Sequence, residues 1–251
     1  MHRVMSSEPG NDAASRLAAA VAEVRILSRL PAPVRQRLVE ASRVERFAPR
    51  AELFRDGELP AHLHVVLSGL VDLSCSYRGQ ECTALMMAAG DVFIPAAALY
   101  SEPYLISASA LTASRILMID ADVVRREARS CTELALALAR VLAGQWRVAL
   151  KIILDLKLRS PSQRLAAFLL RLHDGAQPGP PAALPFSKRQ LASRIGMQPE
   201  TLSRTLQTLA ANGLHLRGRQ IIVTNRAAAE EFCGPDPYPP ASEYELGVHA
   251  L

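Results

Sequence analysis

The C-terminal third of the chain contains two short stretches in which apolar residues recur every three or four positions. The first spans Lys188 to Ile195 and stops at Gly196, a residue type that commonly ends helices. The second begins at Pro199, because proline fits the first turn of a helix. Its inward stripe consists of Leu202, Leu206 and Leu209. The pattern predicts two helices joined by a tight turn.

A small β-hairpin is predicted directly after the second helix. Asn212 and Gly213 end that helix, and the segment HLRGRQIIV then forms two short apolar runs around Gly218. In a helix-turn-helix the start of the second helix enters the major groove of DNA. We therefore predict a helix-turn-helix followed by a hairpin wing.

The predicted recognition helix carries polar residues that suit base edges. Arginine bonds guanine through two donors, glutamate accepts from the amine of cytosine, and serine suits either kind of edge. We assign base contacts to Glu200, Ser203 and Arg204. We assign contacts with the DNA backbone to Ser187, Lys188, Arg189, Thr201, Arg217 and Arg219.

Positive charge is concentrated around these elements. Residues 157–226 contain 11 Lys and Arg against 2 acidic residues, whereas residues 1–156 contain 18 against 17. This distribution favours a nucleic-acid partner. Two alternatives stay open. Glu200 and Arg204, one helical turn apart, also suit an ordinary surface ion pair. An architectural protein that binds DNA without an effector would carry the same basic segment.

Residues Phe47 to Ile119 have a different pattern. Short β-branched and apolar runs are separated by glycines at intervals of 10 to 12 residues, namely Gly57, Gly69, Gly79 and Gly90. Regular short strands of this kind predict a sandwich, a barrel or a rolled sheet.

A long helix is predicted from about Asp122 to Leu156. Its apolar stripe has one polar member, Gln145, and otherwise consists of Leu134, Leu138, Val141, Val148 and Ile152. Because the helix is apolar on more than one side, we expect it to pack on its own sheet and on a second copy of the chain. The chain is therefore predicted to be a homodimer.

The order of rolled sheet, long helix and winged helix-turn-helix resembles the CRP/FNR superfamily of bacterial transcription regulators. The resemblance covers about residues 25–232 and includes FRDGELPAHLHVVLSGLVDL, MAAGDVFI and LKLRSPSQRLAAFLL. Glu200-x-x-Ser203-Arg204 resembles the recognition helix of the FNR branch. The resemblance implies an α+β fold with a cyclic-nucleotide-binding-like β-roll, a dimerisation helix and a C-terminal winged helix-turn-helix.

The predicted segments follow from this resemblance and from composition. They are an N-terminal extension over 1–24, a β-roll sensor domain over 25–121, a dimerisation helix over 122–156, a DNA-binding domain over 157–232 and a disordered tail over 233–251. The resemblance further implies a palindrome with TTGAT-like half-sites and contact with RNA polymerase. It places Arg204 on guanine, Glu200 on the opposite strand and Ser203 at the outer thymine.

The effector window, IPAAALYSEPYLISASAL, departs from the cyclic-nucleotide-binding members. Those members hold the ligand with a glutamate and an arginine, whose positions here fall at Pro95 or Ala96 and at Tyr104 or Leu105. Cyclic AMP is therefore not expected. An iron–sulfur cluster is not expected either, because no cysteine precedes Cys75. The cofactor stays unknown, and haem held by other residues is an open alternative.

An apolar effector pocket is predicted in the same region. Its expected lining consists of Met86, Phe93, Tyr100, Tyr104, Leu105 and Gln145, although these residues also suit a plain core. Cys75 and Cys82 would face each other across a hairpin at Arg78-Gly79, within disulfide distance. They are a candidate redox pair, and the alternative is two reduced thiols.

Other functional classes fit the sequence less well. His62 and His64 alternate along a predicted strand, so they face one side as paired ligands do, but no third ligand accompanies them and no metal is expected. An enzyme is not expected, since no catalytic set, phosphate loop or complete cupin motif is present. No apolar run approaches the length of a membrane span and no secretion signal opens the chain, so we expect a cytoplasmic protein.

Overall fold

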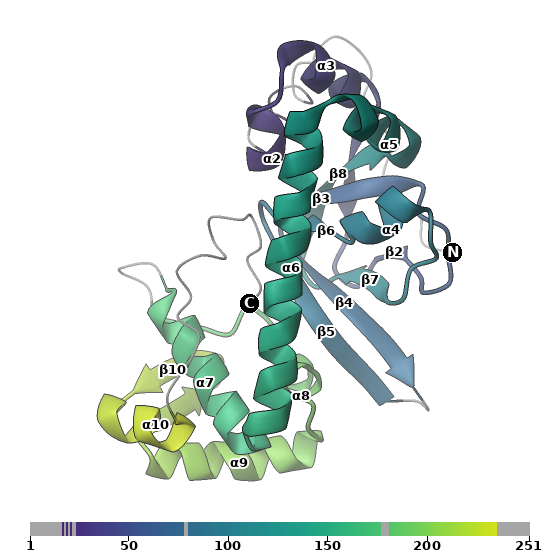
Figure 1. Cartoon of the computed structure of the whole chain (residues 1–251). Coiled ribbons are helices and arrows are strands. Elements are labelled where there is room, and N and C mark those ends of the chain that lie inside the picture. The colour runs from purple at the N-terminus through teal and green to yellow at the C-terminus, as the bar shows by residue number, and fades with distance from the viewer. Residues whose placement is uncertain are drawn as a thin grey trace. The chain divides into compact units, whose positions relative to one another are not determined.

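The computed structural model describes residues 24–77, 80–176 and 181–234, together with residues 17, 19 and 21. The chain divides into two compact units. The first contains the described residues up to Ser76 together with Ala84–Val148, and the second consists mainly of residues after Ala149. Figure 1 labels most of the elements of both units. Of the predicted segments, most of 1–24 and of the tail after Gly234 lies outside the described residues.

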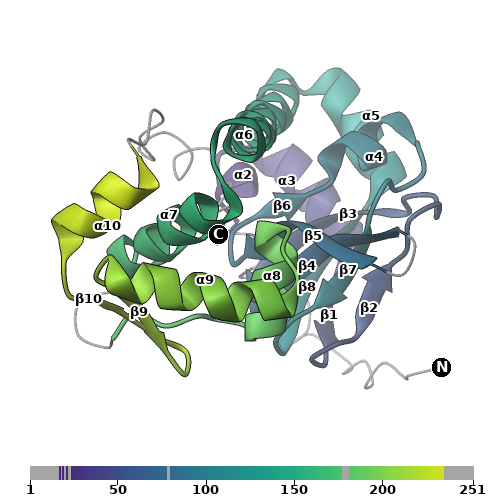
Figure 2. The same ribbon diagram turned by 90° about the horizontal axis from the view of Figure 1, so that it is seen from below.

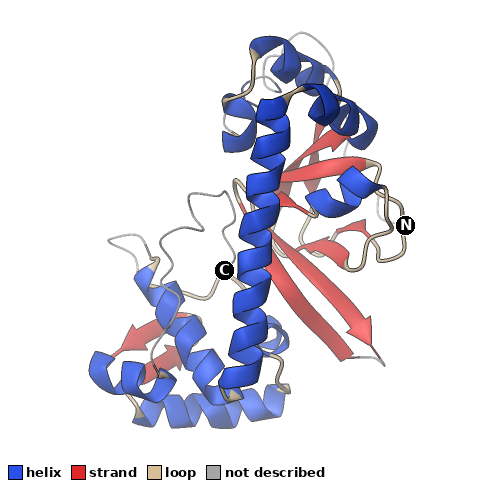
Figure 3. Cartoon of the chain, in the orientation of Figure 1, coloured by secondary structure: helices blue, strands red, loops and turns tan. Residues whose placement is uncertain are grey.

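The first unit is built on two antiparallel four-stranded sheets, which confirms the predicted roll (Figure 3). One sheet has the order β1 (Ser42–Phe47), β8 (Ser114–Asp120), β3 (His62–Ser68) and β6 (Val92–Phe93). The other has the order β2 (Glu52–Phe54), β7 (Ser107–Ala110), β4 (Leu70–Tyr77) and β5 (Gln80–Ala88). The short helix α4 (Pro95–Tyr100) follows β6. The apolar runs within residues 47–119 include strands β3, β4, β5, β6 and β8.

Gly69 joins β3 to β4 at a point where only glycine fits. Its φ is +93°, and a Cβ atom there would lie 2.3 Å from Ser114 Oγ and 2.6 Å from the carbonyl oxygen of Ala113. Both the backbone conformation and the close approach therefore exclude a side chain. This turn keeps β3 and β4 in different sheets, and side chains from both sheets fill the core between them.

Helices cover one side of the roll. They are α2 (Arg25–Ser28), α3 (Ala32–Glu40), α5 (Ala121–Ser130) and the 27-residue helix α6 (Thr132–Leu158). The prediction of a single helix over 122–156 is wrong at its start, because Cys131 has an extended backbone and separates α5 from α6. Glu127 on α5 is buried and accepts two hydrogen bonds from Arg37 on α3, at 2.8 and 2.7 Å, which fixes the direction of α5 before this break.

Helix α6 has two apolar faces. The predicted stripe forms the first, with Leu134, Leu138 and Val141 in the core shared with β3, β6 and β8, Val148 also buried and Ile152 half-buried. Gln145 lies within this face and donates from Nε2 to the carbonyl oxygen of Val92, 2.7 Å away. The second face is exposed and consists of Leu136, Ala139, Ala143, Trp146, Leu150 and Ile153.

The second unit contains three helices that pack together with a two-stranded hairpin and a short final helix (Figure 2). They are α7 (Pro161–Asp174), α8 (Lys188–Ile195), α9 (Pro199–Ala211), β9 (Leu214–Arg217), β10 (Gln220–Val223) and α10 (Arg226–Cys233). Helices α7 and α8 each begin with a capping box, in which Ser160 pairs with Gln163 and Ser187 with Gln190. These local signals explain why the boundaries of α8 and α9 agree with the prediction.

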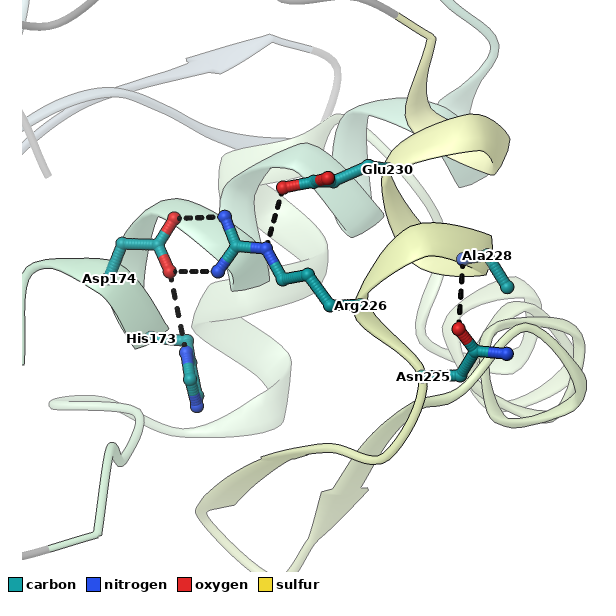
Figure 4. Close-up of polar contacts among 6 residues, drawn as sticks. All are labelled: His173, Asp174, Asn225, Arg226, Ala228 and Glu230. Atoms are coloured by element: carbon teal, nitrogen blue, oxygen red, sulfur yellow. Dashed lines mark hydrogen bonds and ion pairs between the residues drawn. The ribbon is translucent and has the colours of Figure 1, made fainter.

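Helix α10 returns to α7 and is held there by an ion-pair cluster (Figure 4). The two outer nitrogens of Arg226 bond the two carboxylate oxygens of Asp174 at 2.5 and 2.9 Å. The Nε of Arg226 donates to Glu230 at 2.6 Å, and Asn225 caps the helix by accepting from the backbone of Ala228. Sequence reasoning did not identify α10, whose last residue, Cys233, lies one position beyond the predicted domain.

No helix among the described residues is long and apolar enough to cross a membrane.

Candidate nucleic-acid interface

Helix α9 is anchored by one face. Leu202 and Leu209 are buried as predicted, and Leu206 is half-buried. Thr205 is buried as well, and its hydroxyl donates to the carbonyl oxygen of Thr201 at 2.9 Å. Because this bond satisfies the hydroxyl, a polar residue can lie on the inward face of the helix. Sequence reasoning missed Thr205 because the apolar pattern alone does not reveal a threonine whose hydroxyl bonds back to the helix.

The opposite face of α9 is exposed and polar. Glu200, Ser203 and Arg204 lie at positions i, i+3 and i+4, so one helix face presents all three side chains to solvent. No ion pair joins Glu200 to Arg204 in the described part of the chain, which removes the support for a plain surface salt bridge. Pro199 occupies the first turn, and the N-cap residue Gln198 makes no side-chain capping bond.

The residues assigned to the DNA backbone belong to the start of α8, to α9 and to the hairpin. Lys188, Arg189, Thr201 and Arg217 are exposed, and Ser187 caps α8 by accepting from the backbone of Gln190 at 3.3 Å. Arg219 has a second role: its Nε donates to the carbonyl oxygen of Leu184 at 2.8 Å. This bond and the backbone bridge between Ala183 and Gln220 fasten the hairpin to the segment before α8. The predicted phosphate contact of Arg219 would use its other guanidinium nitrogens.

Arg164 on α7 bonds the first helix of the helix-turn-helix. One of its outer nitrogens donates to the carbonyl oxygen of Arg159 at 3.0 Å, and the other donates to that of Ile195 at 3.1 Å. Ile195 is the last residue of α8, and Gly196 follows it with φ of +72° and caps the helix. The guanidinium therefore satisfies a carbonyl at the end of α8 that the helix itself leaves unpaired.

The six residues predicted to line an effector pocket do not share one environment. Met86, Phe93 and Tyr104 are buried, and Phe93 and Tyr104 belong to the core of the roll, where Tyr104 stacks on Phe54 with ring centroids 3.8 Å apart. Tyr100 and Leu105 are 78% and 90% exposed, so they line no cavity with the others. Helix α4 ends between these two residues, at Ser101, whose φ is +57°.

An arginine from outside the predicted effector window contacts a residue within it. Arg125 on α5 donates to the carbonyl oxygen of Ala98 in α4 and also pairs with Asp122. The window itself has no basic residue, and sequence reasoning missed Arg125 because it lies outside the window, 27 residues along the chain from Ala98. Its charge is already balanced by Asp122.

The two histidines of β3 contact protein groups. His64 is 3% exposed and packs against the rings of Phe54 and Phe93, with centroids 5.2 and 5.1 Å away. Burial lowers the pKa of His64 to about 3, so its imidazole is neutral. His62 is half-buried and its Nε2 lies 2.7 Å from a guanidinium nitrogen of Arg43. Burial, aided by Arg43, lowers the pKa of His62 as well.

The candidate redox pair lies on the two strands that flank residues 78–79. Cys75 on β4 is half-buried and Cys82 on β5 is exposed, and the structure holds both as thiols. The turn at Arg78-Gly79 lies outside the described residues. Disulfide formation between the two cysteines stays a prediction.

Comparisons with known proteins agree with this architecture. The family model of the cyclic nucleotide-binding domain matches residues 44–131, and that of the Crp-like helix-turn-helix domain matches residues 163–232. The nitrogen fixation regulation protein FixK of Azorhizobium caulinodans is 29% identical over 192 residues, which are 72% of this chain and 75% of FixK. A CRP-like cAMP-activated global transcriptional regulator of Mycobacterium tuberculosis is 26% identical over 179 residues, 69% of this chain and 80% of the relative.

A solved structure shows the same fold. FixK2 from Bradyrhizobium japonicum superimposes with a TM-score of 0.68 at 23% sequence identity, covering 78% of this chain and 98% of FixK2. Both curated relatives are named as regulators and neither is named as an enzyme, in line with the sequence prediction. Two domain matches in this order, the exposed recognition helix and these relatives lead to one assignment. The chain belongs to the CRP/FNR family of DNA-binding transcription regulators.

Proposed function

We propose that the chain acts as a homodimer that binds a palindrome with TTGAT-like half-sites and regulates transcription from it. The observation that carries the proposal is the polar face of α9, where Glu200, Ser203 and Arg204 are exposed together above a buried face. Arg204 bonds guanine, Glu200 accepts from a base of the opposite strand, and Ser203 lies at the outer thymine. Contact of the bound dimer with RNA polymerase completes the proposal.

The exposed face of α6 supports the dimer. Leu136, Ala139, Ala143, Trp146, Leu150 and Ile153 alternate at steps of three and four residues, which is the spacing of a coiled-coil seam. The face carries no charge, and the two alanines allow close approach of a second helix. Two recognition helices then meet successive major grooves when their spacing is close to one DNA turn, about 34 Å.

The proposed effector is not cyclic AMP, although one relative is named as cAMP-activated. The position that an arginine would need for the cyclic phosphate falls at Tyr104 or Leu105. Tyr104 is packed in the roll core, and Leu105 is exposed and uncharged. An uncharged ligand, haem or the Cys75 and Cys82 thiols are the proposed alternatives for the signal. The signal would act through the roll and α6 on the spacing of the recognition helices.

Fluorescence anisotropy on two labelled duplexes tests the base contacts. We expect Arg204→Ala to weaken binding to a duplex with TTGAT-like half-sites by about 1 to 3 kcal/mol of binding free energy. Binding to a scrambled duplex should stay unchanged. Arg217→Ala is the matched control: it removes an arginine assigned to phosphate, so it should weaken both duplexes equally and lower the salt dependence. Equal loss on both duplexes after Arg204→Ala would favour the architectural alternative.

A further inference from the structure

Three exposed cations of the second unit have no acidic partner of their own. Lys188 begins α8, Arg204 lies on α9 and Arg217 ends β9, and all three side chains are exposed. None of them forms an ion pair in the part of the chain that the structure describes. Residues 181–225 contain six Lys and Arg against a single acidic residue, Glu200. These three side chains, the unpaired cations of the unit, therefore attract a nearby anion.

The chain carries an anionic segment of its own directly after this unit. Residues 235–251 contain Asp236, Glu243 and Glu245 and no Lys or Arg. The three acids define the acidic segment, residues 236–245, which lies outside the described residues. Any Lys or Arg that pairs with these carboxylates within the chain must therefore come from an earlier part of it.

The acidic segment follows a fixed point on the same unit. Helix α10 is held on α7 by the bonds of Arg226 to Asp174, and its last residue, Cys233, is buried. Glu245 follows Cys233 by twelve residues, which span up to about 40 Å when extended. A domain of roughly 80 to 100 residues is about 30 Å across. The acidic segment is therefore long enough to lie along this unit and meet cations on its other elements.

Attachment to the same chain makes even weak pairing effective. Ion pairs between exposed side chains are individually weak, although a carboxylate can accept two hydrogen bonds from one guanidinium. A segment tethered by about ten residues meets its own domain at an effective concentration in the millimolar range. A dissociation constant in the same range is therefore enough to occupy the unpaired cations for half of the time.

We propose that the acidic segment pairs with the unpaired cations Lys188, Arg204 and Arg217 and competes with DNA for them. The proposal rests on the proposed function, because the same three side chains are assigned to DNA. Glu200 lies one helical turn from Arg204 and repels carboxylates, so Lys188 and Arg217 contribute most of the contact. The apparent affinity for every duplex falls by the fraction of chains whose cations are free.

Fluorescence anisotropy on a full chain with an uncharged tail tests the competition. Asp236→Asn, Glu243→Gln and Glu245→Gln together keep the length of the tail and remove its three charges. We expect this variant to bind the TTGAT-like and the scrambled duplex about threefold more tightly than wild type, by the same factor for both. The gain should fade as the salt concentration rises. Equal affinity of variant and wild type at low salt overturns the proposal. Glu102→Gln, which removes an exposed acid of the roll, should leave both affinities unchanged.

A synthetic peptide of residues 235–251 shows whether the contact is direct. In an NMR titration of the uncharged-tail variant, the amide signals of Lys188 and Arg217 should shift saturably, and the scrambled duplex should reverse the shifts. Lys188→Gln and Arg217→Gln should each weaken peptide binding about threefold. Arg129→Gln, which removes an exposed arginine at the end of α5, should leave peptide binding unchanged.

The two measurements separate the possible failures. Absence of saturable peptide binding overturns the proposal even if DNA affinity rises in the uncharged-tail variant, because diffuse repulsion between the tail and DNA then explains the rise. Peptide binding that neither Lys188→Gln nor Arg217→Gln weakens overturns it as well. A chain that binds the peptide but does not distinguish the two duplexes overturns the sequence-specific function and leaves the tail contact in place.

Discussion

At the scale of single residues, the buried His64 makes the stability of the roll depend on pH. Its imidazole is buried against Phe54 and Phe93, and its pKa of about 3 lies well below the ordinary value of 6.5. Between these two values the unfolded chain binds a proton that the folded chain excludes. Stability is therefore expected to fall as the pH is lowered from 6.5 towards 3.

The size of this effect depends on how far the pH lies below the ordinary histidine pKa of 6.5. At pH 5, protonation of His64 in the unfolded chain lowers the free energy of unfolding by about 2 kcal/mol relative to neutral pH. Denaturant unfolding followed by circular dichroism at pH 7.5 and pH 5 measures the loss, and His64→Leu should remove about that amount of the pH dependence. An identical pH dependence in wild type and His64→Leu would show that the imidazole is not the group responsible.

Residues also show where sequence reasoning succeeds and where it fails. The boundaries of α8 and α9 could be predicted because Ser187, Gly196 and Pro199 are local signals that act within one helical turn. The pocket lining could not be predicted. Tyr104 and Leu105 are adjacent in sequence, yet one is in the core and the other in solvent, and no periodicity marks the irregular chain after Ser101.

At the scale of elements, the long-range polar contacts were the least predictable part. Gln145 was recognised as a polar residue in an apolar stripe, but its partner, the Val92 carbonyl, is 53 residues away in sequence. The bond connects α6 to the strand that precedes α4. Similarly, Glu127 in α5, just before the break at Cys131, bonds Arg37, which lies 90 residues away in sequence, and the apolar pattern of α6 contains no sign of this contact.

The docking of α10 on α7 gives a prediction at this scale. Arg226→Ala removes both bonds to Asp174 and the bond to Glu230, so α10 should open more often. Because all three side chains are about half exposed, we expect a loss of about 1 kcal/mol. Hydrogen exchange of the amides in α10 measures it, and Glu230→Gln, which keeps the pair with Asp174, should have the smaller effect.

The same cluster has a defined pH dependence. Arg226 lowers the pKa of Asp174 below its ordinary value of 3.8, with a smaller contribution from His173. The stabilisation is therefore fully present above pH 3.8 and is lost as the pH falls through the lowered pKa. Protection of α10 should be constant from neutral pH down to about pH 5. Loss of protection already at pH 6 would contradict a role for this carboxylate.

At the scale of the whole molecule, the proposed function depends on pairing through the exposed face of α6. A helix that buries one apolar face in its own domain has no structural need for a second, and the exposed face continues over six positions with side chains as large as Trp146. Exposed apolar surface of this extent marks an interaction site. In a two-fold pairing each residue of the seam is used twice, so one substitution alters both sides of the interface.

Leu150→Asp is therefore expected to separate the two copies. Leu150 is 41% exposed in the single chain, and an aspartate in the seam would place two carboxylates in an apolar contact. We expect dimerisation to weaken by about 3 kcal/mol or more, roughly a hundredfold, as measured by light scattering across a concentration series. Leu59→Asp, at a leucine that is 69% exposed on the roll, is the matched control and should leave the dimer intact.

If the Leu150→Asp chain is monomeric, it should lose affinity for the palindrome while keeping the affinity of one recognition helix for a half-site, because α9 is untouched. A persistent dimer in Leu150→Asp, with full palindrome binding, would place the interface on another surface and leave the second apolar face of α6 to a different partner.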